Sequence, residues 1–170
     1  VLRADGGEWT RADAVTVEQL PDGRKLVRFN HPGGASSIAA AFCYPYSLPD
    51  LDATLAELGP AWERGTIGVT HEGRPIPRLR LSNAKTEPRP GLYLMARQHS
   101  GETPGSWALD GILRHLASDT EEARSLREDL DVWVCPMVDL DGVVNGDYGK
   151  DALPWDYNRA WERLPMRASA

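Results

Sequence analysis

Residues 91–119, GLYLMARQHSGETPGSWALDGILRHLASD, decide the fold because they join a strand pattern, a polar loop and a helix pattern. The run GLYLMA is short and wholly apolar, which is typical of a strand covered on both faces of a sheet. Pro104 suits a first helical turn, so the helix should begin at Thr103 or Pro104. Its apolar stripe consists of Leu109, Ile112, Leu113 and Leu116. A second apolar run, DLDVWVCPMV, comes later, and this order predicts an α/β layer structure in which both strands are central.

The polar loop RQHSGE, residues 97–102, falls at the carboxyl end of the first strand if that strand spans 92–96. Open α/β sheets place their ligand sites at this end. Gly101 lets the loop turn sharply, so that the His99 imidazole and the Glu102 carboxylate can converge. Both groups suit Zn²⁺. Taken alone, His-x-x-Glu is also compatible with a capped helix start that carries an exposed histidine.

Two further helix features follow from the pattern. Asp110 and Arg114 lie four residues apart, opposite the apolar stripe, which predicts a solvent-facing ion pair worth a few tenths of a kcal/mol. Upstream, residues 47–59, SLPDLDATLAELG, predict a short helix with Asp50 as its N-cap and Gly59 at its end.

Turn signals organise the strands of the first part of the chain. Apolar residues alternate on both sides of PDG, residues 21–23, which predicts a hairpin in a small β unit. A second alternating segment begins at Gly65 and turns at EGRP, residues 72–75. The helix predicted at residues 47–59 separates these two strand segments, so we place a domain boundary near Ser47.

Composition restricts the function classes. The chain has 170 residues, of which 41% are hydrophobic and 26% charged, as in soluble globular proteins. The formal net charge is −6 and the 19 Lys and Arg are scattered, which argues against nucleic-acid binding. No apolar run approaches the ~18–20 residues of a membrane helix. Cys43 and Cys135 lie in apolar stretches, which favours buried reduced thiols and a cytoplasmic location.

A second polar stretch favours the interpretation of the loop 97–102 as a metal site. Residues 135–161, CPMVDLDGVVNGDYGKDALPWDYNRAW, leave an apolar strand, pass a loop rich in Gly and Asp, and return at Asp156, Asn158 and Arg159. With His99 and Glu102, this pattern resembles the zinc metallocarboxypeptidases, which share His-x-x-Glu, a Pro-Asp-Gly-like turn and Asp-x-Asn-Arg. The cytosolic-carboxypeptidase branch looks most similar, because its members carry a preceding β domain and a junction like YPY at 44–46.

The resemblance implies a fold and domain organisation. We expect a mixed-sheet α/β/α zinc-carboxypeptidase-like domain, incomplete here, preceded by part of a small β domain. Residues 1–47 would be the C-terminal part of that β domain, and residues 48–170 the N-terminal half of the catalytic domain.

The resemblance also implies an activity, the zinc-dependent removal of C-terminal amino acids from peptides or proteins. His99 and Glu102 would be two of three zinc ligands. Asn158 and Arg159 would grip the terminal carboxylate of the substrate, since the planar fork of Arg meets both carboxylate oxygens. Without the resemblance, the Asn-Arg pair would be interpreted as an ordinary surface loop.

Two departures from the family pattern matter. The third ligand, a histidine, and the general-base glutamate lie further downstream in the family, and His31, His71 and His115 are not expected to replace that ligand. We therefore expect a truncated chain that alone lacks peptidase activity, binds zinc weakly and self-associates. The family also has an arginine that stabilises the substrate carbonyl oxygen, but residues 142–157 contain no Arg.

Lys150 is the one cation in that interval, and it could supply the missing positive charge or be a solvated loop lysine. Loss of one such donor costs about 10²- to 10³-fold in rate in other enzymes. Asp139 is expected to form loop hydrogen bonds rather than bind metal. Two other functions stay open, a zinc deacylase of N-acyl amino acids and a catalytically silent binder of carboxylate termini. The β unit with YPY disfavours the first, and the missing arginine favours the second.

Overall fold

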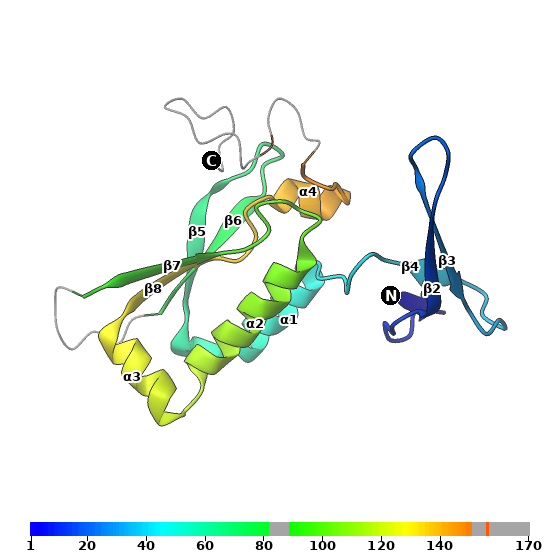
Figure 1. The fold of residues 1–170 in the computed structure, drawn as a ribbon. Coiled ribbons are helices and arrows are strands. Elements are labelled where there is room, and N and C mark those ends of the chain that lie inside the picture. Colours follow the sequence, from blue (N-terminus) through cyan, green and yellow to red (C-terminus); the bar gives the residue numbers. More distant parts are fainter. Residues whose placement is uncertain (82–88, 151–155, 157–170) are drawn as a thin grey trace. The chain divides into compact units, whose positions relative to one another are not determined.

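The structure, a computed structural model, describes residues 1–81, 89–150 and 156 (Figure 1). The chain divides into two compact units, Val1–Pro45 and Tyr46–Ala170. Among the described residues, no helix has both the length and the apolar character needed to cross a membrane.

The first unit consists of two antiparallel strand pairs. They are β1 (Leu2–Ala4) with β4 (Ile38–Ala40), and β2 (Asp13–Gln19) with β3 (Lys25–Asn30). The Leu20 N–H donates to the Arg24 carbonyl at 2.8 Å across the PDG turn, which confirms the predicted hairpin. Within the described residues of this unit, Leu2 is the only buried hydrophobic side chain, so the unit has little core of its own.

The second unit contains a four-stranded mixed sheet in the order β5-β6-β8-β7. Its strands are β5 (Glu63–Val69), β6 (Pro75–Leu81), β7 (Gly91–Met95) and β8 (Asp131–Cys135). Within the described part of this unit, only the β7–β8 pair is parallel; β6 pairs antiparallel with both β5 and β8. The helices are α1 (Leu48–Glu57), the 3-10 turn η1 (Gly59–Ala61), α2 (Thr103–Ala117), α3 (Glu121–Asp129) and α4 (Leu140–Asn145).

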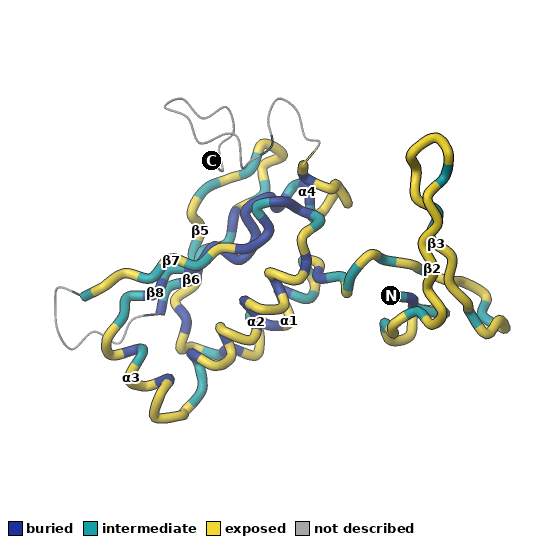
Figure 2. Tube along the Cα trace, viewed as in Figure 1, coloured by how far each residue is buried: buried dark blue, intermediate teal, exposed yellow. Residues whose placement is uncertain are grey.

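The core lies between the sheet and α2. Buried side chains of β6 and β8 pack against the α2 stripe, and the cluster includes Leu79, Leu81, Val132, Val134, Leu109, Leu113 and Leu116. Figure 2 shows this burial concentrated along β8, at the point where β7 and β8 end, and on the inner side of α2. Ile112 was expected in the stripe, but it is 41% exposed, because the buried face is narrower than the pattern suggested.

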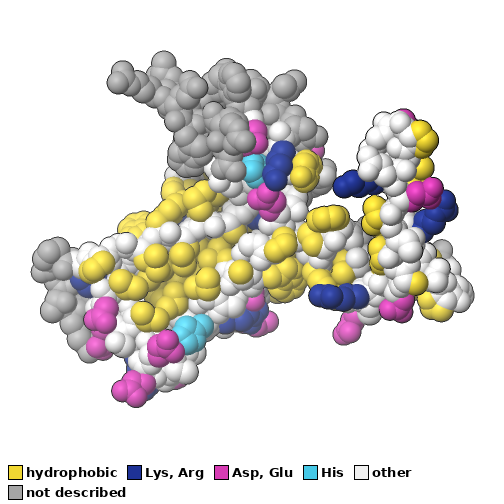
Figure 3. All heavy atoms as spheres, viewed as in Figure 1, with side chains coloured by type: hydrophobic (Ala, Val, Ile, Leu, Met, Phe, Trp, Pro, Cys, Tyr) yellow, Lys and Arg dark blue, Asp and Glu magenta, His cyan; other side chains and the backbone are white. Residues whose placement is uncertain are grey.

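The prediction of two central strands is right for β8 and wrong for β7 in the described part of the sheet, where β7 is the outermost strand. Tyr93 on β7 is accordingly 53% exposed, and Met95 and Trp107 are also exposed. Figure 3 shows a patch of exposed hydrophobic side chains between β7 and α2. An open strand edge beside exposed apolar surface is a template for association with another strand.

The start of α1 corrects the predicted N-cap. The cap residue is Ser47, and Asp50 is the third helical residue, whose carboxylate accepts hydrogen bonds from the Ser47 N–H at 2.7 Å and the Ser47 hydroxyl at 2.6 Å. Asp50 thus takes the carboxylate position of a capping box. The start of α2 at Thr103, with Pro104 in the first turn, is as predicted.

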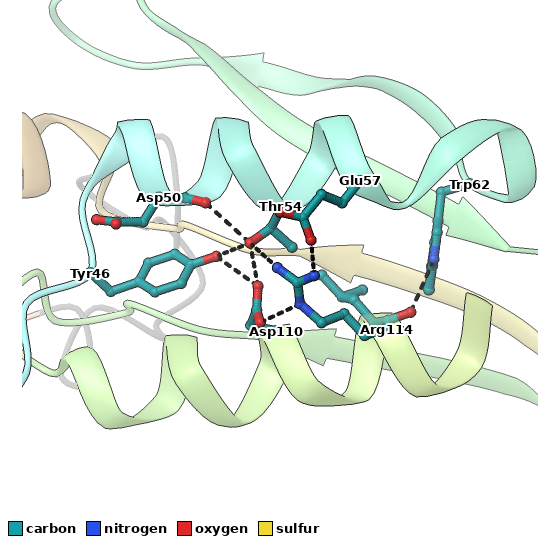
Figure 4. Close-up of polar contacts among 8 residues, drawn as sticks. Tyr46, Asp50, Thr54, Glu57, Trp62, Asp110 and Arg114 are labelled. Atoms are coloured by element: carbon teal, nitrogen blue, oxygen red, sulfur yellow. Dashed lines mark hydrogen bonds and ion pairs between the residues drawn. The ribbon is translucent and has the colours of Figure 1, made fainter. Parts of the chain in front are cut away.

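The predicted solvent-facing pair of α2 is wrong, because Asp110 is buried between α1 and α2 (Figure 4). Its carboxylate accepts hydrogen bonds from the Thr54 hydroxyl, from the Tyr46 hydroxyl at 3.4 Å and from Arg114 Nε at 2.8 Å. Arg114 extends further to Glu57 on α1. We refer to Tyr46, Thr54, Asp110 and Arg114 as the interhelix cluster. It ties the two helices together through charge-assisted hydrogen bonds.

Candidate metal site

The loop that carries the candidate ligands follows β7, as the sequence predicted. Because β7 and β8 are parallel, the segments that follow them leave the sheet at the same edge. These segments are bonded to each other, since the Val138 N–H donates to the Ala96 carbonyl at 3.1 Å and the Asp139 N–H donates to the Arg97 carbonyl at 2.9 Å. The loop 97–102 therefore rests on the polypeptide that enters α4.

His99 and Glu102 converge within this loop. Nδ1 of His99 lies 3.2 Å from Oε2 of Glu102. The His99 side chain is buried, whereas the Glu102 side chain is 50% exposed. The Glu102 N–H donates to the His99 carbonyl at 3.1 Å, and this bond closes the turn that places both side chains on one side.

Asp156 holds the other side of the imidazole ring. Its Oδ1 lies 2.8 Å from His99 Nε2. In the sequence, Asp156 stands out only as part of the Asp-x-Asn-Arg pattern, which assigns it no role. Its contact spans 57 positions of the chain, and no local spacing rule could predict it.

The two carboxylates also set the charge of the ring. Burial disfavours the charged imidazole, but hydrogen bonds to Asp156 and Glu102 outweigh it, and the pKa of His99 is raised above its ordinary value. The pKa of Glu102 is lowered, first by the hydrogen bond from Lys150 and then by His99, against the effect of burial. Glu102 is therefore an anionic ligand candidate at neutral pH.

Lys150 reaches the same carboxylate from the loop after α4. Its Nζ lies 2.8 Å from Glu102 Oε1, and its side chain is 40% exposed. The ammonium group also lies 5.6 Å from the centroid of the Tyr148 ring. The structure thus brings Lys150 next to the candidate ligands.

Close packing around the loop explains two glycines. A Cβ at Gly149 would lie 2.6 Å from the Ser100 nitrogen and 3.1 Å from the His99 Cα, and the backbone there has φ +89°. A Cβ at Gly142 would lie 2.7 Å from the Ser100 hydroxyl. Larger residues at either position would push the ligand loop away from its support.

The remaining predicted residues are distributed as follows. Asn158 and Arg159 lie outside the described residues. His115 approaches Glu122 at 3.8 Å on the α2–α3 pair and is not part of the site. The loop predicted after β8 is wrong in part, because Leu140–Asn145 form α4, and Asp139 is its N-cap, whose carboxylate accepts a hydrogen bond from the Gly142 N–H at 3.3 Å. Neither Cys43 nor Cys135 forms a disulfide bond; Cys135 is buried as predicted, whereas Cys43 is only partly buried. Burial raises the pKa of Cys135 to about 11.

The donor pair fits zinc. Ligand atoms bound to one tetrahedral zinc at ~2.0–2.2 Å lie about 3.3–3.6 Å apart, and the observed separation of Nδ1 and Oε2, 3.2 Å, is close to the lower end of that range. Zinc-binding histidines usually donate their second ring N–H to a carboxylate, the position that Asp156 occupies. The described residues contain no cluster of three or more His, Cys, Asp or Glu side chains arranged to hold a metal ion. His99 and Glu102 are therefore a pair of candidate ligands.

Comparison with known proteins gives one family. The sequence profile described as zinc carboxypeptidase matches residues 51–165. Human cytosolic carboxypeptidase 1 is 42% identical over 139 residues, which cover 72% of this chain and 11% of that protein. Cytosolic carboxypeptidase 2 of Xenopus tropicalis is 31% identical over 158 residues, which cover 84% of this chain and 16% of that protein. The chain thus spans only a small part of the length of these relatives.

Solved structures agree with this result. A metallo-carboxypeptidase from Pseudomonas aeruginosa matches 99% of this chain with a TM-score of 0.81 at 27% identity, and 44% of that chain is covered. A metallo-carboxypeptidase from Burkholderia cenocepacia matches 94% of this chain with a TM-score of 0.76 at 28% identity, and 43% of that chain is covered. The predicted mixed-sheet α/β zinc-carboxypeptidase-like fold is confirmed.

Proposed function

This chain belongs to the zinc carboxypeptidase family, and we propose that its protein removes C-terminal amino acids from peptides or proteins with bound Zn²⁺. One observation supports the proposal above all others. The imidazole of His99 and the carboxylate of Glu102 lie 3.2 Å apart in the loop at the carboxyl end of β7. Asp156 fixes the far nitrogen of the ring at 2.8 Å.

The roles of the residues follow from their chemistry. His99 and Glu102 hold the metal, and Asp156 orients His99 and keeps its Nδ1 available as a donor atom. When bound, Zn²⁺ acts as a Lewis acid that polarises the scissile carbonyl group and makes a water molecule more acidic. Lys150 supplies positive charge toward the carbonyl oxygen as negative charge develops there.

Asn158 and Arg159 bind the free carboxylate of the substrate in this proposal. The guanidinium fork donates two parallel hydrogen bonds, and the Asn amide adds a neutral donor. The substrates are peptide or protein C-termini, and the names of the cytosolic relatives support a cytoplasmic location. The absence of activity in a polypeptide of these 170 residues alone remains a prediction.

The test compares three substrates in the zinc-loaded protein, a peptide with a free C-terminus, the same peptide amidated, and an N-acyl amino acid. We expect turnover of the free peptide, loss of turnover on chelation and recovery with zinc. Preferential turnover of the N-acyl amino acid would instead support a deacylase.

A matched variant tests the carboxylate grip. We expect Arg159→Lys to weaken binding of the free peptide far more than binding of the amidated peptide, because an ammonium group does not reproduce the fork. Arg24→Lys, at an exposed arginine of the first unit, serves as the control and should change neither. Equal losses for both peptides with Arg159→Lys would reject the assigned role.

A silent carboxylate binder remains the second candidate, and one feature of the chain favours it. Residues 142–157 contain no Arg. A protein of this kind would bind the free peptide, discriminate against the amidated one and release both unchanged.

A further inference from the structure

Arg97 occupies an unusual position between β7 and the candidate ligands. Arg97 is only 6% exposed. Arginine is rarely buried in this way unless its charged group has partners. Its backbone has φ 57°, in the left-handed region that residues other than glycine rarely adopt. Unfavourable backbone geometry of this kind persists only where surrounding contacts enforce it.

The guanidinium group supplies those contacts. Nε donates to the Ser100 carbonyl at 2.8 Å, and Nη2 donates to the same oxygen. Nη1 donates to the Tyr46 carbonyl at 2.6 Å and approaches the Ser106 hydroxyl at 3.4 Å. One planar group thus connects the ligand loop, the residue preceding the N-cap of α1 and the first turns of α2.

The backbone of the same residue adds a fourth connection. The Arg97 carbonyl accepts the Asp139 N–H at 2.9 Å, from the residue that caps α4. Ser100, whose carbonyl is held by the guanidinium, directly follows His99. The Ser100 hydroxyl donates to the Asp147 carbonyl at 2.8 Å, which extends the link to the loop that carries Lys150.

We propose that Arg97 is the positioning residue of the zinc site, which holds the Ser100 carbonyl so that His99 and Glu102 converge. The proposal rests on the proposed function, since it concerns the same site. Arg97 is not one of the candidate ligands. It acts by fixing the backbone between the two ligands, a task that needs a planar group with several donors in a fixed geometry.

Lysine is the informative replacement, because it keeps the charge and most of the length but cannot reach three acceptors in one plane. Arg80→Lys is the matched control. Arg80 also forms a bidentate ion pair, in which Nε and Nη2 each donate to one carboxylate oxygen of Asp131 at 2.9 Å. Its guanidinium group lies over the Trp133 ring. Asp131 begins β8, so this pair lies at the opposite end of that strand from the ligand loop.

The first readout is zinc affinity, measured by competition with a chelator in the whole protein. Loss of a residue that supports metal ligands commonly lowers metal affinity by about 10- to 100-fold, and we expect a fall of this size for Arg97→Lys. Arg80→Lys should leave the affinity within about twofold. Unchanged affinity in Arg97→Lys, or an equal fall in Arg80→Lys, would overturn the proposal.

The second readout is independent of the metal. It follows two backbone bonds of the ligand loop in protein stripped of metal: the Gly101 N–H donates to the Tyr148 carbonyl and the Glu102 N–H donates to the His99 carbonyl, both at 3.1 Å. We expect these two amides to exchange with solvent faster in Arg97→Lys and at the original rate in Arg80→Lys. Unchanged exchange in Arg97→Lys would show that the loop holds its shape without the guanidinium, and the proposal would fall.

The two readouts separate this proposal from the proposed function. Wild-type protein that binds no zinc would contradict the proposed function, while the exchange measurement would still decide whether Arg97 fixes the loop. If Arg97→Lys does not fold, Arg97→Gln replaces it, since the amide can still donate to one of the acceptors. The same losses are then expected and the same null results overturn the proposal.

Discussion

Two groups of polar side chains lie along α2, and their central carboxylates differ in exposure and in the number of hydrogen bonds that they accept. In the interhelix cluster, Asp110 is 9% exposed and accepts hydrogen bonds from three side chains. At the start of the same helix, the Glu102 side chain is half exposed, and its partners His99 and Lys150 are both ionisable. The carboxylate of the first group is covered by α1, whereas the carboxylate of the second is half exposed to solvent.

This difference separates a structural role from a chemical one. A closed cluster holds two helices together, because each donor has an acceptor that water cannot replace without cost. An open pair at a loop can exchange its hydrogen bonds for bonds to a metal, provided that the loop is held in place. The comparison predicts that substitutions in the two groups affect different measurable properties.

The largest expected effect is on zinc content. We expect His99→Ala or Glu102→Ala to remove the zinc, because two remaining protein ligands do not complete a tetrahedral site. Metal analysis of the purified protein provides the measurement. Asp110→Asn, from the closed cluster, is the control and should retain stoichiometric zinc. Stoichiometric zinc in both ligand variants would show that the metal is held elsewhere.

Lys150 gives the next largest effect. We expect Lys150→Met to lower kcat by about 10²- to 10³-fold at full zinc occupancy, the range for loss of one donor to a developing oxyanion. Lys150 is the residue chosen because its Nζ lies 2.8 Å from the carboxylate of the candidate ligand Glu102, so its positive charge is next to the proposed metal site. Steady-state kinetics measure the effect, and Lys25→Met on β3 is the control. A kcat equal to that of the wild type would identify Lys150 as a solvated loop lysine.

The closed cluster has its own prediction, which concerns stability. We expect Asp110→Asn to lower the free energy of unfolding by about 1–3 kcal/mol, because the buried hydroxyls of Thr54 and Tyr46 and the guanidinium of Arg114 lose their charged acceptor. Urea denaturation measures the difference. Asp129→Asn, at the exposed end of α3, should stay within about 0.5 kcal/mol of the wild type. A loss of zinc without a loss of stability in Asp110→Asn would reverse the assignment of the two groups.

The sequence predicted the open group better than the closed one. His99 and Glu102 are three residues apart on one loop, so local spacing was sufficient to pair them. Asp110 and Arg114 are four apart on a helix, and that spacing suggested a solvent-facing pair. The buried position of Asp110 depends on Tyr46 and Thr54, which are distant in sequence and approach it only after α1 and α2 pack.

The same limit applies to the fold. Apolar runs and turn residues predicted both hairpins, the α2 start and the strand-helix-strand order, because these are local signals. The position of β7 at the outside of the described sheet depends on which strands pair, and no local pattern contains that information. The cap of α1 was missed for a different reason, since Ser47 and Asp50 are both good N-cap residues and only their mutual hydrogen bonds decide between them.

The smallest predicted effect is the pH dependence of the contribution that Asp110 makes to the free energy of unfolding. Burial raises the pKa of Asp110, but hydrogen bonds from Arg114, Thr54 and Tyr46 and the charge of Arg114 outweigh it, so the pKa lies below its ordinary value. A carboxyl group whose pKa is lowered on folding stabilises the folded state above its unfolded pKa, which is ~3.9 for Asp. That contribution disappears as the pH falls through the folded pKa.

The sign of the effect gives a measurement. We expect the difference in unfolding free energy between wild type and Asp110→Asn to be constant from neutral pH to about pH 5 and to shrink below about pH 4. Other carboxylates, such as Asp131, whose pKa is lowered by hydrogen bonds from Arg80, lose their contributions in both proteins, so the difference isolates Asp110. Urea titrations between about pH 2 and 7 measure it. A difference that stays constant down to the acid limit would mean that the cluster stabilises α1 against α2 by packing, not by the charge on Asp110.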